Sequence, residues 1–99
     1  MNNMEVIITD EAFQDIDDIS DFIASDNVQE ARKVIDMFFE CFDMLAKFPN
    51  LGVEKSNIKT KNTKIFIIKK QYLVAYKIAN EKLIIFKVSY RYQNIYSIL

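Results

Sequence analysis

The chain has 99 residues, 51% of them hydrophobic, and a formal net charge of −1 at pH 7, which suits one domain with an ordinary core over residues 1–99. It contains no histidine and a single cysteine, which argues against an internal disulfide, a zinc or transition-metal site or a histidine general base, and we expect no cofactor. No apolar run reaches the roughly 18 residues that span a bilayer and the first residues lack a signal peptide, so the sequence favours a cytoplasmic protein with no membrane partner.

The first predicted elements are a strand over Met4–Thr9, which is rich in β-branched residues, and a helix that follows it. Thr9 or Asp10 offers the N-cap of this helix. Its apolar residues are spaced four, three and four apart and form one stripe, made of Ala12, Ile16, Ile19 and Ile23. A calcium loop needs a glycine and a closing glutamate, and both are missing here. We therefore interpret the clustered aspartates as a solvated helix face: Asp15, Asp17, Asp18 and Asp21.

A second helix is predicted over about residues 27–48, after a break at Ser25–Asn27. Its apolar stripe consists of Val28, Ala31, Ile35, Phe38, Phe42 and Leu45, widened by Phe39 and Ala46. Cys41 lies at the edge of the stripe, where we expect it to be buried. Because the break is short, the two helices should form an antiparallel hairpin, and Pro49 and Gly52 should end the second one.

Residues 50–63 are polar and are predicted to be a loop, after which three β-rich runs follow at 65–68, 72–79 and 83–90. Short polar breaks separate the runs, which indicates an antiparallel meander. The predicted fold class is therefore α+β, with an N-terminal strand and an antiparallel helix hairpin packed on one face of a mostly antiparallel sheet.

The register of the last hairpin is predicted from the alternation of its side chains. A two-residue loop would place Lys77 in the apolar layer, so we prefer a three-residue loop at Asn80–Lys82. This loop pairs Ile78 with Ile84, Tyr76 with Phe86 and Val74 with Val88. One face of the sheet is then wholly apolar and receives the helices, while the other face is half apolar and half basic.

The charges are segregated along the chain. Residues 1–54 carry thirteen acidic and three basic residues, a net of −10, and residues 55–99 carry ten basic residues and one acidic residue, a net of +9. A basic second half suits a polyanion or an acidic protein segment as partner. The alternative is internal pairing, in which an acidic layer packs on a basic one.

Three segments carry recognisable local patterns: Glu11–Ala24 (EAFQDIDDISDFIA), Met44–Gly52 (MLAKFPNLG) and Tyr72–Asn94 (YLVAYKIANEKLIIFKVSYRYQN). The first looks like the first helix of the RelE/ParE toxin superfamily, the second is similar to the exit of its second helix, and the third looks like its terminal hairpin. In this order they span nearly the whole chain. The resemblance implies a growth-inhibiting type II toxin, neutralised in a hetero-oligomer by a cognate antitoxin whose C-terminal segment wraps around it.

One branch of this superfamily, the ParE-like toxins, inhibits DNA gyrase and is not enzymatic. The segment Val88–Asn94 is similar to the ParE-like ending, usually Val-x-His-x-Arg-Gln-Asp. Val88 and Gln93 match directly, whereas Tyr90, Tyr92 and Asn94 replace the His, Arg and Asp of the pattern. This resemblance, slightly favoured over the other branch, implies a target-binding role for Tyr90, Arg91, Tyr92, Gln93 and Asn94.

The other branch, the RelE-like toxins, cleaves mRNA in the ribosomal A site, with basic residues on the phosphates and an Arg and a Tyr near the C-terminus. Arg91 and Tyr96 lie one residue out of step with that pattern. Without histidine, a lysine or tyrosine with a lowered pKa would have to act as base, and electrostatic stabilisation would dominate. The catalytic candidates of this branch are Lys59, Lys61, Lys87, Arg91 and Tyr96. The alternative is that the lysines are solubilising loop charges and protect edge strands, and that Tyr96 packs on the core.

The half-apolar sheet face is the predicted site of the antitoxin. A segment with acids beside aliphatic residues would complement Leu73, Lys77, Ile85 and Lys87. Because several signature residues are replaced, a non-toxic family member that only binds its antitoxin stands as a third alternative.

Overall fold

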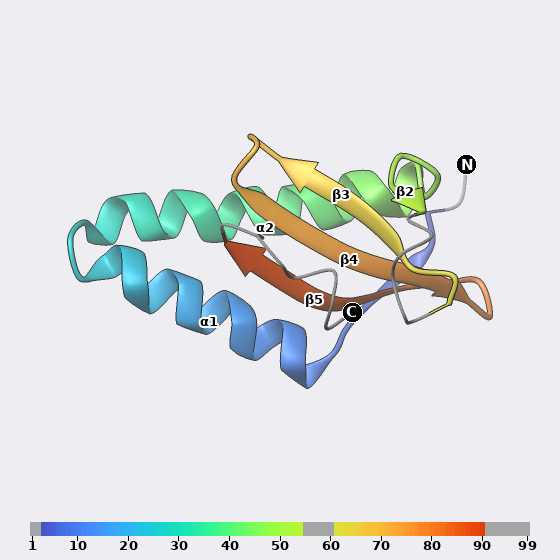
Figure 1. The fold of residues 1–99 in the computed structure, drawn as a ribbon, viewed down its shortest axis with the longest axis horizontal. Helices are drawn as coiled ribbons and strands as arrows, with labels where there is room; N and C mark the ends of the chain where they lie inside the picture. The colour runs from blue at the N-terminus through green and yellow to red at the C-terminus, as the bar shows by residue number, and fades with distance from the viewer. Residues whose placement is uncertain (1–2, 55–60, 91–99) are drawn as a thin grey trace.

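The computed structural model describes residues 3–54 and 61–90, in which an N-terminal strand and two helices precede four strands (Figure 1). The elements are β1 (Glu5–Ile8), α1 (Asp10–Ala24), α2 (Val28–Lys47), β2 (Val53–Glu54), β3 (Lys64–Ile68), β4 (Tyr72–Ala79) and β5 (Lys82–Tyr90). This order confirms the predicted α+β class, the helix hairpin and the meander. The short strand β2 was not predicted, because its two residues lie in the segment predicted as a loop.

The two helices begin at residues whose side chains cap them. Thr9 Oγ1 accepts a hydrogen bond from the Ala12 backbone N–H at 3.2 Å, and Asn27 Oδ1 accepts one from Glu30 N–H at 3.0 Å. Each cap satisfies a backbone donor that the first helical turn leaves without a partner. Thr9, rather than Asp10, is therefore the N-cap of α1.

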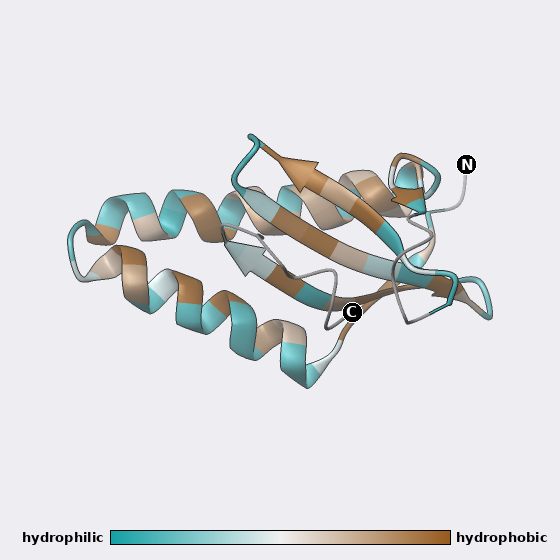
Figure 2. Ribbon diagram, in the orientation of Figure 1, coloured by the Kyte–Doolittle hydropathy of each residue, from teal (hydrophilic) through white to brown (hydrophobic). Residues whose placement is uncertain are grey.

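The predicted apolar stripes are confirmed except at Val28, at the start of α2, and at Phe39, which is 39% exposed. Val28 is 59% exposed, because the α1–α2 connection projects beyond the ends of the strands (Figure 1). Val34, which lies outside the predicted stripe, is buried instead. The buried side chains that the stripes predicted include Ala12, Ile16, Ile19, Ala31, Phe38, Phe42 and Leu45. Figure 2 shows the resulting alternation of hydrophilic and hydrophobic residues along each helix.

The five strands form one sheet in the order β1-β5-β4-β3-β2. β1 runs parallel to β5, and the helix hairpin connects β1 to the rest of the sheet. The other three pairings are antiparallel, so the sheet is mostly antiparallel as predicted. β1 pairs only with Lys82–Ile85, and the second half of β5 extends beyond it.

The predicted register of the β4–β5 hairpin is wrong near its turn. The turn has two residues, Asn80 and Glu81, which both adopt positive φ angles of 53° and 63°. Such a turn matches the twist of the flanking strands. It pairs Ile78 with Leu83, and a β-bulge at Phe86 then restores the predicted pairing of Val74 with Val88.

The bulge decides which β5 side chains face the helices. Leu83, Ile85 and Val88 belong to the main core between sheet and helices, together with Val74 and Tyr76 of β4. Ile84 and Phe86, which the predicted register placed in that core, lie outside the main core cluster. A second, smaller cluster consists of Ile65, Leu73 and Ala75, with Ile67 and Phe86 packed against it.

A buried tyrosine holds the segment that follows α2. The Tyr76 hydroxyl donates to the Pro49 carbonyl at 2.7 Å and accepts from the Gly52 N–H at 2.8 Å. A Cβ atom at Gly52 would lie 2.5 Å from that hydroxyl oxygen, so only glycine permits this approach. The lone proline and the lone glycine therefore end α2 as predicted, and Tyr76 fixes the path of the chain toward β2.

Candidate functional site

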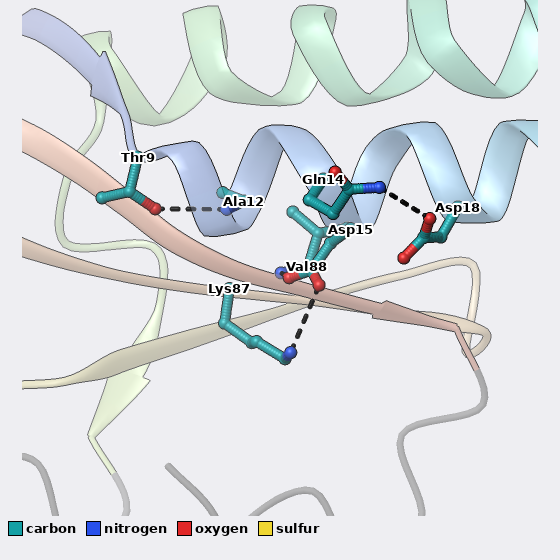
Figure 3. A network of polar contacts seen from close by, with 7 residues as sticks. All are labelled: Thr9, Ala12, Gln14, Asp15, Asp18, Lys87 and Val88. Atoms are coloured by element: carbon teal, nitrogen blue, oxygen red, sulfur yellow. Dashed lines mark hydrogen bonds and ion pairs between the residues drawn. The ribbon is translucent and has the colours of Figure 1, made fainter.

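The candidate site lies where β5 passes the end of β1. Thr9 N–H donates to the Ile85 carbonyl at 3.0 Å, and this is the last backbone contact that β1 and the cap residue make with β5. Beyond Ile85, α1 lies beside the second half of β5 (Figure 3). We call the space between them the α1–β5 groove, with Asp15, Asp18 and Phe22 on its α1 side and Lys87, Val88 and Tyr90 on its β5 side.

Asp15 connects the helix to the strand through both of its carboxylate oxygens. Oδ1 accepts from Lys87 Nζ at 3.2 Å, and Oδ2 accepts from the Val88 backbone N–H at 2.9 Å (Figure 3). The side chains of Asp15 and Lys87 are only 15% and 21% exposed. A charge-assisted contact of this kind is stronger than a pair in open solvent. Asp15 thus accepts a hydrogen bond from a backbone N–H of β5 that lies beyond the residues paired with β1.

Asp18 follows one helical turn after Asp15 and remains exposed. Its Oδ1 accepts from Gln14 Nε2 at 2.8 Å (Figure 3). The prediction that the four α1 aspartates form one solvated face is wrong for Asp15. The signal was present, since Asp15 precedes the buried Ile19 by four residues and therefore lies at the border of the apolar stripe.

A series of aromatic rings leads from the groove into the core. Phe22 is 65% exposed and its ring centroid lies 6.3 Å from that of Tyr90. Tyr90 stacks on Tyr72 at 5.1 Å, and Tyr72 meets Phe38 edge to face at 5.3 Å. Burial raises the pKa of the Tyr72 phenol, and the nearby Tyr90 and Glu30 add to that rise, so Tyr72 stays protonated at neutral pH.

Two cavities border the Phe22–Tyr90 pair. The α1–β5 groove has a volume of about 390 Å³, and a neighbouring cavity of about 320 Å³ extends past Asp26 and Glu30 to Tyr72. Both cavities include Phe22 and Tyr90 in their linings. The site is therefore an elongated surface with carboxylates and aromatic rings.

The structure separates the predicted catalytic residues that it describes. Lys61 is exposed in the turn before β3, whereas Lys87 lies in the α1–β5 groove and is paired with Asp15. Arg91 is among the predicted residues outside the described part of the chain, together with Lys59, Tyr92, Gln93, Asn94 and Tyr96. Tyr90 is the one residue of the predicted target-binding set that is described, and it lines both cavities.

The predicted antitoxin surface is divided between the two sheet faces. Leu73 belongs to the smaller cluster and is fully buried, and Lys77 is half-buried on the same strand. Ile85, which was placed beside them, is instead fully buried in the main core, because the two-residue turn reverses the alternation of β5 before the bulge. Lys87 lies in the groove.

No group of three or more metal-ligating side chains is arranged to hold a metal ion within residues 3–54 and 61–90. Among the same residues, no helix has the length and apolarity that crossing a membrane requires. The chemistry available in the described part of the site is therefore that of carboxylates, lysine and aromatic rings.

Comparisons with known proteins agree with this architecture. A family model described as ParE toxin of the type II toxin–antitoxin system parDE matches residues 6–95. A chain of the chromosomal ParDE system from P. aeruginosa has a similar fold, with a TM-score of 0.73 and 16% identity over 88% of this chain and 95% of that one. A conserved hypothetical protein of Helicobacter pylori, HP0894, superposes with a TM-score of 0.54 and 15% identity over 88% and 93% of the two chains. No curated protein sequence matches this chain.

Proposed function

The chain belongs to the ParE toxin family of type II toxin–antitoxin systems, and from that premise we propose that it arrests growth by inhibiting DNA gyrase until a cognate antitoxin neutralises it. The match to the family over residues 6–95 carries the toxin assignment. The choice of gyrase rests on the residues of the candidate site.

The pairing of Lys87 favours gyrase over mRNA as the target. A lysine that stabilises a phosphate must present its ammonium group to the RNA, but Lys87 is paired with Asp15 at 3.2 Å. Breaking that pair to bind RNA would leave a largely buried carboxylate without its partner, at a cost of about 1–3 kcal/mol. Of the catalytic candidates within residues 3–54 and 61–90, only Lys61 is exposed.

The proposed target-binding segment begins at the end of β5 and runs from Tyr90 through Arg91, Tyr92 and Gln93 to Asn94. Its support is the sequence similarity to the ParE-like ending and the position of Tyr90, whose ring lines both cavities. Aromatic and arginine side chains of this kind supply much of the binding energy at protein interfaces. A non-enzymatic inhibitor needs such a surface and no general base.

The first test is pulse-induced expression in a bacterium, with thymidine and leucine incorporation followed in parallel over the first minutes. We expect thymidine incorporation to fall first, and we expect the purified protein to inhibit supercoiling by purified gyrase. Arg91→Ala and Tyr92→Ala should abolish both effects, whereas Lys59→Ala and Lys61→Ala should leave them intact. Early loss of leucine incorporation, with cleaved mRNA on ribosomes, would establish the RelE-like alternative instead.

That alternative has one specific observation in its favour, the net charge of +9 over residues 55–99. Phosphate contacts would make its ribosome binding strongly dependent on salt. If induction affects neither label, the protein is a non-toxic member of the family that only binds its antitoxin.

A further inference from the structure

The α1–β5 groove and the cavity beside it carry an excess of negative charge. Asp15 is neutralised by Lys87, but Asp18 forms no ion pair with any described residue. The neighbouring cavity adds Asp26 and Glu30, and none of the described residues that line it is basic. Folding thus leaves three carboxylates along one elongated surface without a cation of their own in the described chain.

An exposed aromatic ring stands among these carboxylates. Phe22 is 65% exposed, although an apolar ring of this size is normally turned inward. It lines both cavities and is held against Tyr90 at an interplanar angle of 47°. The face of an aromatic ring attracts a cation, and carboxylates within reach strengthen that attraction.

We propose that this surface receives an arginine side chain of the antitoxin, with the guanidinium group beside Asp18 and its plane against Phe22. The identity of the partner rests on the proposed function. Arginine fits better than lysine because its planar guanidinium stacks on an aromatic ring and donates two parallel hydrogen bonds to a carboxylate. Asp26 and Glu30 select further basic residues in the same segment.

The proposed partner segment is basic, whereas the sequence predicts an acidic one. An acidic antitoxin segment was expected to bind Lys77 and Lys87, but Lys87 already has Asp15 as its anion. An acidic segment in the groove would meet Asp18, Asp26 and Glu30 and would be repelled. Charge complementarity therefore requires a basic and apolar segment at this surface.

The first experiment measures binding of a fluorescent nonapeptide that alternates leucine and arginine, with a control peptide in which neutral citrulline replaces each arginine. We expect the arginine peptide to bind at least about tenfold more tightly than the control, as charge-assisted and cation–π contacts together imply. Asp18→Asn and Phe22→Ala should each remove most of that difference. The matched control is Asp17→Asn, an exposed neighbour that lines neither cavity.

Equal binding of the two peptides, absence of binding, or an equal effect of Asp17→Asn and Asp18→Asn would overturn the proposal. Asp18 and Phe22 are exposed, so neither substitution is expected to unfold the chain, and circular dichroism verifies this.

The second experiment uses the antitoxin itself, defined as the protein whose co-expression restores growth. We expect Asp18→Lys to weaken its affinity for the purified chain at least about tenfold, because a like charge replaces the carboxylate. An arginine-to-glutamate change in the antitoxin should restore binding to Asp18→Lys and to no other variant. Unchanged affinity for Asp18→Lys would overturn the inference and leave the toxin assignment standing. Failure of the wild type to arrest growth would instead overturn the proposed function, while the peptide measurement remains a test of the groove.

Discussion

Tyr76→Phe removes one oxygen atom and should be among the most destabilising conservative changes in the chain. The Tyr76 side chain is fully buried, and its hydroxyl bonds both the Pro49 carbonyl and the Gly52 N–H. Each buried polar group left without a partner costs about 1–3 kcal/mol. Gly52 is buried, but Pro49 is only half-buried and regains some water, so we expect the free energy of unfolding to fall by about 2–3 kcal/mol. For a chain of this length that corresponds to a decrease in Tm of roughly 10–20 °C.

Urea denaturation followed by circular dichroism measures this loss, and the m-value shows whether the unfolding transition stays the same. Tyr72→Phe is the matched control. Tyr72 is also buried, at 5% exposure, and within the described residues its hydroxyl makes no hydrogen bond. The control should change the free energy of unfolding by less than about 0.5 kcal/mol. If the two substitutions cost the same, the loss comes from packing and the reasoning about the hydroxyl is wrong.

Gly52→Ala completes the test as a double-mutant cycle. The added Cβ would lie 2.5 Å from the Tyr76 hydroxyl oxygen and 2.8 Å from the ring. We expect Gly52→Ala to be destabilising in the wild type and less so beside Tyr76→Phe, where the hydroxyl is gone and its bond to Gly52 is already lost. Strict additivity would mean that the two residues do not interact.

Three further substitutions test other features of the structure. Asp15→Ala should lower the free energy of unfolding, measured by urea denaturation, by about 1–3 kcal/mol, because Lys87 and the Val88 N–H lose the carboxylate that accepts from them. The exposed Asp17→Ala should lower it by less than about 0.5 kcal/mol, and equal losses would contradict the contact. Glu81→Gly should raise the free energy of unfolding by about 0.5–1 kcal/mol, since glycine accepts the positive φ of 63° without strain; a gain of the same size in Glu81→Ala would point to charge instead. Burial raises the pKa of the Cys41 thiol from 9.0 to about 12, so the folded chain keeps a proton that the unfolded chain releases, and stability is complete below pH 9 and declines as the pH rises toward 12. Cys41→Ala should reduce the decline between pH 9 and pH 11, and an unchanged slope would show that another group causes it.

The helices were predictable because their signals are local. Spacing of three and four residues identified the buried faces, and the capping residues set the starts to within one residue. The exceptions, Val28 and Phe39, have helical positions that fit the stripe but remain 59% and 39% exposed. Periodicity reports the direction of a side chain and not whether a second element lies there to cover it.

The hairpin register failed for a different reason. Its prediction required both strands to alternate without interruption, and under that condition a two-residue turn puts Lys77 in the core. The chain instead combines the two-residue turn at Asn80 and Glu81 with a bulge at Phe86, and Lys77 stays out of the main core. Neither the turn nor the bulge contains a glycine, which would be the usual sequence signal, and the positive φ angles of the turn fall on Asn80 and Glu81.

The site was the least predictable part, because it depends on contacts between residues far apart in sequence. Asp15 and Lys87 are separated by 72 positions and meet only because β1 is shorter than β5 and leaves its edge to α1. Lys87 was a candidate because of its charge and its place near the chain end. Nothing local to Lys87 indicates that α1 supplies the opposing charge.

The charge segregation of the sequence now has a partial physical account. The described residues contain two ion pairs, Lys87 with Asp15 and Lys64 with Glu54, and each joins the acidic half to the basic half. Internal pairing therefore exists, and within residues 3–54 and 61–90 it removes two carboxylates, whereas the acidic half carries thirteen. The exposed acids of α1 and of the start of α2 repel one another in the free protein, and a basic partner segment would relieve that repulsion. Binding of such a segment should for this reason stabilise the fold as well as cover the groove, since a ligand that binds only the folded state raises the free energy of unfolding.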